Sequence, residues 1–237
     1  MRLMTVRVAL IVSCGLAASA WGQVSSNASL KGTYYFRSTQ LPVASKATVT
    51  QYGSMTFDGV GAVAIAGQTL TGTASASAYT GTATYTVKPG GYATITQQGA
   101  APLNVRLCVG ALVGSSTEAG QDTYDMFLAV PAASATSNAT LTGAYWISTL
   151  EAPNGIEGNL RSANFKLSSG GQGSFGELSI AGQARNLGNR YQTQTIGAMS
   201  YTVASDGTGS VSFPLAPTLD STTQITAGVK AIYVAGD

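Results

Sequence analysis

Three short segments occur twice in this chain, in the same order and at nearly constant spacing. The spacing between the two copies is 115 residues for the first segment, 116 for the second and 111 for the third. Such internal self-similarity indicates that one structural unit has been duplicated. The paired segments begin at Ile65 and Ile180 (Ile-Ala-Gly-Gln), at Tyr85 and Tyr201 (Tyr-Thr-Val), and at Leu30 and Leu141 (Leu-x-Gly-x-Tyr).

The first 22 residues have the pattern of a secretory signal peptide. Arg2 and Arg7 flank the start of a short apolar run, and small residues follow it, so cleavage is expected after Ala20 or Gly22. The run is shorter than the roughly 20 apolar residues of a transmembrane helix. A lipoprotein signal that ends at Cys14 is disfavoured, because Ile-Val-Ser precedes this cysteine. We therefore expect a protein that is secreted, periplasmic or on the cell surface, with no transmembrane segment in the mature chain.

The predicted domain organisation follows from these two features. It consists of a signal peptide (1–22), repeat one (23–133) and repeat two (134–237). A linker of small polar residues around 132–138 separates the two repeats.

Short segments with alternating apolar and polar residues run through both repeats. In one of them Ala83, Tyr85 and Val87 share one face, and three threonines occupy the other. A period of two is typical of a β-strand with one buried face. Asp-Gly pairs at Asp58 and Asp206 separate such segments, and Asp-Gly favours tight hairpin turns.

The predicted fold class is all-β. We expect two tandem antiparallel meander β-barrels, or sandwiches, of about eight and six to seven strands. A barrel is favoured over a sandwich because closure removes the exposed edge strands. In repeat one, strands are expected near residues 32–38, 47–57, 61–70, 76–87, 92–97, 103–109, 111–116 and 124–130.

Repeat two has the sequence of an incomplete unit. The segment from Val229 resembles the segment from Val105, with a cation after the valine in each, but fewer residues follow it. One interpretation is a truncated sequence or a naturally shorter barrel. The other is an open sheet that accepts a strand from a neighbouring molecule.

The residue types present exclude several classes of chemistry. The chain has no histidine, and the mature chain has a single cysteine, Cys108. This removes the commonest general base, the usual catalytic triads and cysteine zinc sites. The acidic pairs Asp122/Asp125 and Glu151/Glu157 are weak calcium candidates, and solvated loops are the favoured interpretation. We therefore predict no enzyme activity, no catalytic residues, no metal and no cofactor.

The charge balance also limits the partners. Removal of the two signal-peptide arginines leaves ten basic and ten acidic residues. A chain without a net positive charge offers no basic face for nucleic acid. A net charge near zero removes the repulsion between copies and favours self-association.

Four tyrosines occupy matched places in the two repeats, namely Tyr34, Tyr85, Tyr145 and Tyr201. They fit core positions whose hydroxyls reach the barrel rim. They also fit the wall of a cavity for a small apolar ligand. Small residues facing the interior would leave room for such a ligand, and the segment 62–78 is rich in alanine. Asn27-Ala-Ser and Asn138-Ala-Thr match the glycosylation pattern.

The run of Gly32-x-Tyr34-x-Phe36, Asp58-Gly59-x-Gly61 and Gly81-Thr-x-Thr-Tyr85 resembles a repeat found in uncharacterised secreted bacterial proteins. Gly32-x-Tyr34 is also similar to the Gly-x-Trp near the start of lipocalins, with Tyr in place of Trp. The lipocalin resemblance implies a barrel that holds an apolar ligand.

Two functional hypotheses remain. The first is an exported, non-catalytic β-barrel protein that binds a small apolar ligand or a surface partner. The second is a structural or adhesive cell-surface subunit that assembles through open strand edges. An outer-membrane barrel is disfavoured, because the outer strand faces are rich in Thr and Ser and aromatic residues, at 8%, are few.

Overall fold

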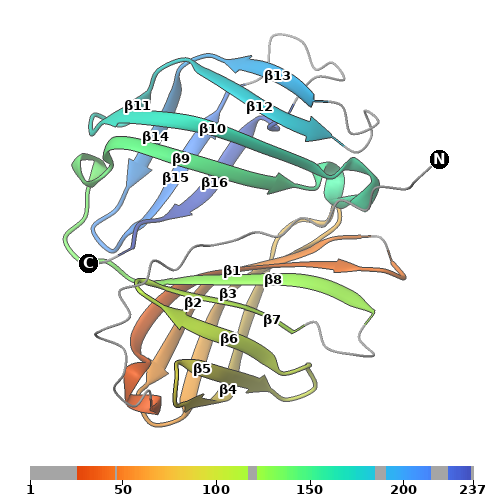
Figure 1. Cartoon of the computed structure of the whole chain (residues 1–237), viewed down its shortest axis with the longest axis vertical. Coiled ribbons are helices and arrows are strands. Elements are labelled where there is room, and N and C mark those ends of the chain that lie inside the picture. The colour runs from red at the N-terminus through yellow and green to blue at the C-terminus, as the bar shows by residue number, and fades with distance from the viewer. Residues whose placement is uncertain (1–25, 46, 117–121, 185–190, 215–223, 236–237) are drawn as a thin grey trace.

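The computed structural model describes residues 26–45, 47–116, 122–184, 191–214 and 224–235. These residues form two separate antiparallel sheets, of which the first is a closed barrel and the second is open (Figure 1). The expected all-β fold is confirmed, and a barrel rather than a sandwich is found in the first unit. The expected signal peptide, with its cleavage site and Cys14, lies outside the described residues.

The barrel consists of eight strands whose order in space is their order in the sequence. Strand β1 pairs with β2 on one side and with β8 on the other, which closes the sheet. The strand boundaries agree with the expected ones to within four residues. The strands are β1 (Lys31–Pro42), β2 (Val49–Asp58), β3 (Ala62–Thr71), β4 (Ser77–Lys88), β5 (Tyr92–Gln97), β6 (Leu103–Cys108), β7 (Ala111–Ser115) and β8 (Thr123–Pro131).

The alternation seen in the sequence sorts the barrel residues into an inner and an outer face. Ala83, Tyr85 and Val87 of β4 are buried inside, and the threonines between them are exposed. Phe57, Leu112 and other large side chains fill the interior and are almost fully buried. The barrel therefore has a packed core at the level of these residues.

The described residues of the second unit form eight strand segments, β9 to β16. Strand β12 pairs with the first half of β10, and β11 pairs with its end. On their other sides, β12 pairs with β13 and β11 pairs with β14. The segments are β9 (Thr142–Glu151), β10 (Arg161–Gly170), β11 (Ser174–Phe175), β12 (Leu178–Ala184), β13 (Tyr191–Ile196), β14 (Met199–Val203), β15 (Thr208–Phe213) and β16 (Gly228–Tyr233). Four short 3-10 helices complete the described structure: Asn27–Ser29, Asn138–Thr140, Pro153–Gly155 and Glu157–Asn159.

The second sheet ends in β9 on one side and in β16 on the other. Within the described part of the chain, β9 pairs with β10 alone and β16 pairs with β15 alone. The sheet is therefore open, which was one of the two alternatives left by the sequence.

The expected match between Val105 and Val229 is wrong in register. Val105 points into the barrel, and Arg106 lies on the outside, with its guanidinium 4.2 Å from the ring centre of Tyr92. Lys230 pairs with the buried Val211 and therefore lies on the inner face of its sheet. The two cations consequently face opposite sides of their strands.

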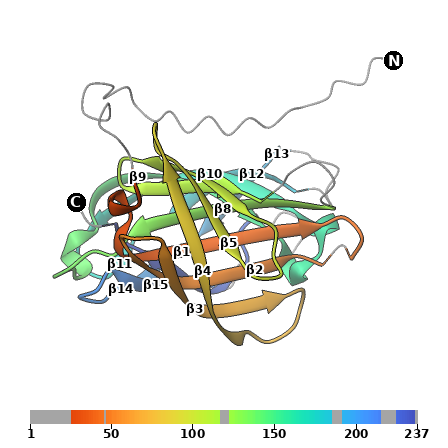
Figure 2. The ribbon, with the colours of Figure 1, turned by 90° about the horizontal axis from the view of Figure 1, so that it is seen from below.

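The two units touch at both ends of the open side of the second sheet. At one end the rings of Tyr35 and Tyr233 stack, with centroids 4.9 Å apart and planes 9° from parallel. At the other end the backbone N–H of Thr48 donates to the carbonyl of Gly155 over 2.8 Å. Figure 2, which views the molecule from below, places barrel strands in front of the second sheet. The opening of the second sheet thus lies on the side that faces the barrel (Figure 1).

Candidate functional site

The site best defined by the fold is the pair of unpaired edges of β9 and β16, called the open edges below. Five successive antiparallel pairings lead from β9 through β10, β11, β14 and β15 to β16, so β9 and β16 run in opposite directions. In the barrel, β1 and β6 occupy the positions that β9 and β16 occupy in the second sheet. There β7 and β8 lie between β6 and β1 and close the sheet. An unpaired strand edge exposes a row of backbone N–H and C=O groups that can pair with another chain.

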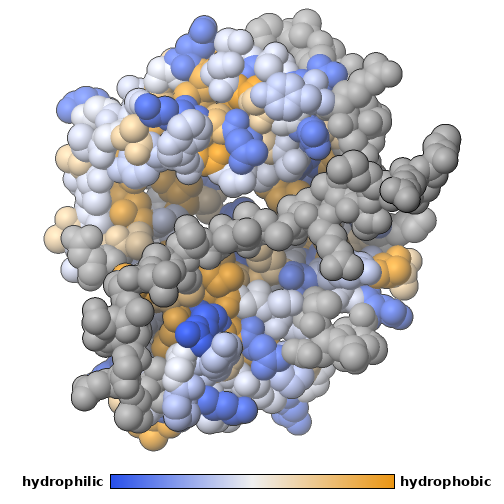
Figure 3. Space-filling view, in the orientation of Figure 1, coloured by the Kyte–Doolittle hydropathy of each residue, from blue (hydrophilic) through white to orange (hydrophobic). Residues whose placement is uncertain are grey.

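The inner face next to the open edges is only half buried. Phe36 of β1 and Val105 of β6 are each 3% exposed, because β7 and β8 cover them with Leu112 and Phe127. Ile147 and Ile232 face the interior of the second unit from β9 and β16, and both are only partly buried. In Figure 3, hydrophobic side chains are visible on the part of this unit that faces the barrel. The apolar core of the second unit is therefore less completely buried beside the open edges than the corresponding core of the barrel.

Large apolar side chains also lie on the outer face along both edges. Trp146 and Leu150 of β9 are 81% and 52% exposed, and Val229 of β16 is 73% exposed. Scattered apolar residues are normal on a protein surface, but tryptophan beside accessible backbone is typical of a protein contact.

A group of polar side chains joins the two edge strands at one end of the opening. Glu151 Oε1, at the end of β9, lies 2.6 Å from Lys230 Nζ of β16. The backbone N–H and the hydroxyl of Thr226 both donate to Glu151 Oε2 over 2.9 Å. Glu151 therefore forms an ion pair, and it does not act with Glu157 as a carboxylate pair.

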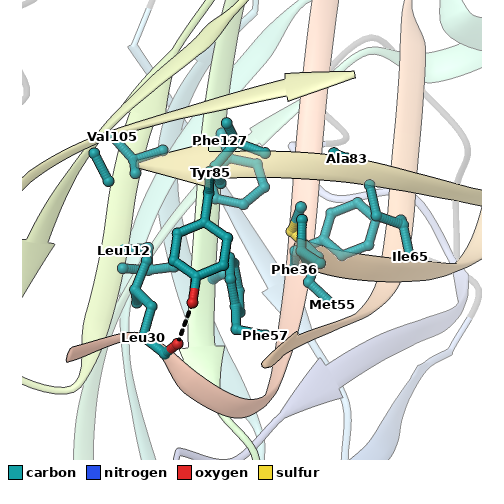
Figure 4. Packing of buried hydrophobic residues seen from close by; sticks show 14 of the residues in the cluster. Leu30, Phe36, Met55, Phe57, Ile65, Ala83, Tyr85, Val105, Leu112 and Phe127 are labelled. Atoms are coloured by element: carbon teal, nitrogen blue, oxygen red, sulfur yellow. Dashed lines mark hydrogen bonds between the residues drawn. The ribbon is translucent and has the colours of Figure 1, made fainter. Parts of the chain in front are cut away.

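Tyr34 and Tyr85 lie near the end of the barrel where Leu30 enters the core. The Tyr85 hydroxyl donates to the carbonyl oxygen of Leu30 over 2.8 Å (Figure 4). It also lies 3.1 Å from the carbonyl oxygen of Asn27, to which it can donate as well. The rings of Tyr34 and Tyr85 both pack edge-on against Phe57. Burial raises the pKa of both tyrosines above the ordinary value. Both residues pack in or against the core of this end of the barrel.

Tyr201 and Tyr145 have the related positions in the second unit. The Tyr201 hydroxyl lies 2.7 Å from Ser169 Oγ and donates to the carbonyl oxygen of Asn138 over 3.1 Å. Tyr145 is half-buried, and its hydroxyl donates to the carbonyl of Thr142 over 3.1 Å. Tyr34 and Tyr85 thus share Phe57 as a packing partner, whereas Tyr145 and Tyr201 lie in the second unit, where both contribute to the same hydrophobic cluster. Ligand binding at these four tyrosines stays a prediction.

The alanines that were considered as a sign of interior space lie on the outer face of the barrel. Ala62, Ala64 and Ala66 of β3 are exposed, whereas Val63 and Ile65 between them are buried. These alanines therefore leave no room inside the barrel.

Asn27 and Asn138 have a structural role that the sequence reading missed. The backbone N–H of Val87 donates to Asn27 Oδ1, and that of Val203 donates to Asn138 Oδ1, each over 2.8 Å. Asn27 Nδ2 also donates to the carbonyl of Val60 over 2.6 Å. Each asparagine begins a 3-10 helix that closes one end of its unit. The signal was present as Asn-Ala-Ser/Thr-Leu, which occurs in both units at the spacing of the Leu30/Leu141 pair.

Charged groups also mark the contact between the two units. Burial raises the pKa of Tyr35, and the nearby Asp206 carboxylate raises it further. Hydrogen bonds from Thr208 lower the pKa of Asp206, because they stabilise its charged form. This arrangement holds the turn before β15 against β1 of the barrel.

The Asp125 carboxylate of the other acidic pair is held by hydrogen bonds from neighbouring serines. Asp125 accepts hydrogen bonds from the Ser116 N–H over 2.9 Å and from the hydroxyls of Ser115 and Ser116. Within the described ranges, no three His, Cys, Asp or Glu side chains lie together as a metal site would require. No helix in the same ranges is both long and apolar enough to cross a membrane. The chain matches no protein-family model, no curated protein and no solved structure.

Proposed function

We propose that this protein is an exported, non-catalytic structural subunit that assembles with other copies of itself through the open edges of its second unit. The observation that carries the proposal is that, among the residues that the structure describes, no strand lies beside the outer edges of β9 and β16, whereas β7 and β8 fill that place in the barrel. Adding a strand to an exposed edge is a common mode of protein association.

The direction of the strands supports pairing between copies. Because β9 and β16 run in opposite directions, β16 of a second copy in the same orientation is antiparallel to β9 of the first. Repetition of this contact joins the copies head to tail, into a ring or an open chain. Trp146 and Val229, which flank the two edges, become buried by such a contact.

We also propose that the two units are copies of one repeat. In both units, a tyrosine hydroxyl from the fourth strand position donates to the carbonyl of the asparagine that begins the first 3-10 helix. The duplicated segments around Tyr85 and Tyr201 supply these tyrosines. On this basis the second unit is a barrel unit without the last two strands. The proposed export rests on the first 22 residues, which have the pattern of a signal peptide.

The experiment is a measurement of mass in solution over a wide concentration range, by light scattering and native mass spectrometry, on the protein from an exporting host. We expect a ladder of multimers. Val229→Lys and Trp146→Lys place a cation beside each edge and should shift the ladder toward monomer. Val60→Lys is the matched control, because Val60 is 77% exposed but lies in a barrel turn far from β9 and β16 in the strand order.

Two results would contradict the proposal. One is a monomer at every concentration. The other is a ladder that all three lysine variants weaken equally, because the multimers would then form elsewhere.

A further inference from the structure

The barrel is plugged at one end and open at the other. At the plugged end the 3-10 helix Asn27–Ser29 lies across the strands, and Leu30 is 1% exposed. At the other end a pocket opens into the barrel. Its floor includes the core residues Phe36, Met55 and Phe127 (Figure 4).

The second unit fills the corresponding end with a segment of its own chain. Gln194 Oε1 accepts the backbone N–H groups of Gln224 over 2.7 Å and of Ile225 over 3.0 Å. Glu151 Oε2 accepts the next backbone N–H group, that of Thr226, over 2.9 Å. Ile225 is 2% exposed and belongs to the hydrophobic core of the unit. Two side-chain acceptors thus hold three consecutive backbone N–H groups, and the aliphatic side chain among them enters the core.

Gln40 of the barrel has the position of Glu151. The two are 111 residues apart, which is the spacing of the duplicated segments at the start of the repeats. Gln40 lines the pocket, and so does Ser38, which precedes it in the same inward-facing row and is 8% exposed. Among the residues that the structure describes, the side chains of Ser38 and Gln40 have no hydrogen-bond partner. Their oxygen atoms can therefore accept N–H groups from a molecule in the pocket.

Tyr79 of the barrel has the position of Gln194. It lies three inward-facing positions before Tyr85, as Gln194 does before Tyr201. The Tyr79 hydroxyl lines the pocket and donates to Gln97 Oε1 over 2.5 Å, so its oxygen keeps a lone pair that can accept a hydrogen bond. The barrel thus has an acceptor at each of the two matching positions.

The two units differ in the connection that supplies the filling segment. Residues 214–227 connect β15 to β16 and include the buried Ile225, whereas the shorter connection 98–102 joins β5 to β6 in the barrel. This shorter connection contributes Ala100 and Ala101 to the lining of the pocket. In the described part of the barrel, the acceptors and the apolar floor are therefore present without a segment between them.

We propose that the open end of the barrel binds an extended peptide segment of another polypeptide. Backbone N–H groups of the segment donate to Gln40 and Tyr79, and an aliphatic side chain packs on the apolar floor, as Ile225 packs in the second unit. An apolar pocket with a few polar groups that fix orientation is typical of a binding site. This site is separate from the open edges and does not depend on the proposed assembly.

The test uses the peptide acetyl-Gln-Ile-Thr-amide, which has the sequence of residues 224–226. The protein is labelled with ¹³C at the methionine methyl groups. Met55 then reports the pocket floor, Met199 the core of the second unit and Met126 the outer face of β8. We expect the peptide to shift the Met55 signal with a Kd of about 1 mM and to leave the other two signals in place.

Two matched peptides separate the backbone contribution from that of the side chain. A peptide methylated at its three backbone nitrogens has no N–H groups to donate there and should not shift Met55. A peptide with glycine in place of isoleucine should bind about tenfold more weakly, because it buries no aliphatic side chain.

Two pairs of variants locate the binding. Gln40→Leu removes the acceptor and should weaken the peptide about fivefold, whereas Thr39→Leu, on the outer face of the same strand, should not. Ala101→Phe puts a ring in the pocket lining and should abolish the Met55 shift, whereas Ala64→Phe, on the exposed outer face of β3, should not. No Met55 shift with the first peptide, an equal shift with the methylated one, a shift confined to Met199, or equal effects within either pair of variants would overturn the proposal.

Discussion

The carboxylate of Glu151 and the ammonium group of Lys230 lie 2.6 Å apart and join the two edge strands of the open sheet. The contact is made by side chains, at a place where the barrel has two further strands. Glu151 also holds Thr226, next to the segment that closes one end of the second unit.

Glu151→Gln should therefore lower the free energy of unfolding of the second unit by about 1–2 kcal/mol, because a half-buried ion pair and its hydrogen bonds are lost. Denaturation by urea, followed through Trp146 fluorescence on β9, measures this value. Glu177→Gln is the control, since Glu177 is exposed in the same unit. An equal effect of both changes would contradict the role given to Glu151.

Tyr85→Phe should destabilise the barrel by about 1–2 kcal/mol, because the buried carbonyl oxygen of Leu30 and the half-buried one of Asn27 lose their hydroxyl donor. Urea denaturation followed by circular dichroism measures the change. Tyr92→Phe removes a hydroxyl from a tyrosine that is 60% exposed and should have no measurable effect. A Tyr85→Phe protein as stable as the Tyr92→Phe protein would show that the hydroxyl does not hold the 3-10 helix.

Asp58 should make the barrel sensitive to acid. Its Oδ1 accepts the N–H groups of Gly61 and Val60, which lower the carboxyl pKa below its ordinary value of 3.8. A lowered pKa in the folded state means that this stabilisation is present above pH 3.8 and is lost as the pH falls through the folded-state pKa.

The urea midpoint should therefore fall more steeply with acid in the natural protein than in Asp58→Asn, which does not titrate. The measurement is a series of urea titrations between about pH 2 and pH 6. Parallel curves for the two proteins would refute the assignment.

Gly173→Ala should destabilise the second unit by about 1–3 kcal/mol, because Gly173 has a φ of +82°, where side chains are strained. A Cβ atom there would also lie 2.8 Å from Asn138 Nδ2. Gly170→Ala is the matched control at the end of β10, where a Cβ atom meets nothing within 4 Å. Thermal unfolding of the two variants compares them directly, and similar melting temperatures would contradict the prediction.

The barrel strands were predictable because their alternation is strong and Gly-containing turns separate them. In β4, for example, apolar residues at 83, 85 and 87 alternate with threonines, and the structure buries the apolar set. For the second unit six to seven strands were expected, whereas the described residues form eight strand segments, because β10 pairs with both β11 and β12 along its length.

Other features depend on contacts that a local pattern does not contain. The register of β16 was misread because Val229 and Lys230 are similar in type to Val105 and Arg106, while strand pairing puts Lys230 inside. The segment at Gln224 and Ile225 has no periodicity, and Gln194, 30 residues away, holds it in place. The pocket beside Phe36, Met55 and Phe127 could not be predicted either, since its lining comes from residues spread between β1 and β8.

The most direct test of the proposed assembly is amide hydrogen exchange, measured by mass spectrometry at low and at high protein concentration. The account predicts that amides of β9 and β16 become protected as multimers form, while those of β1 and β6, which are already paired on both sides, stay unchanged. Multimers that form without new protection in β9 and β16 would contradict it.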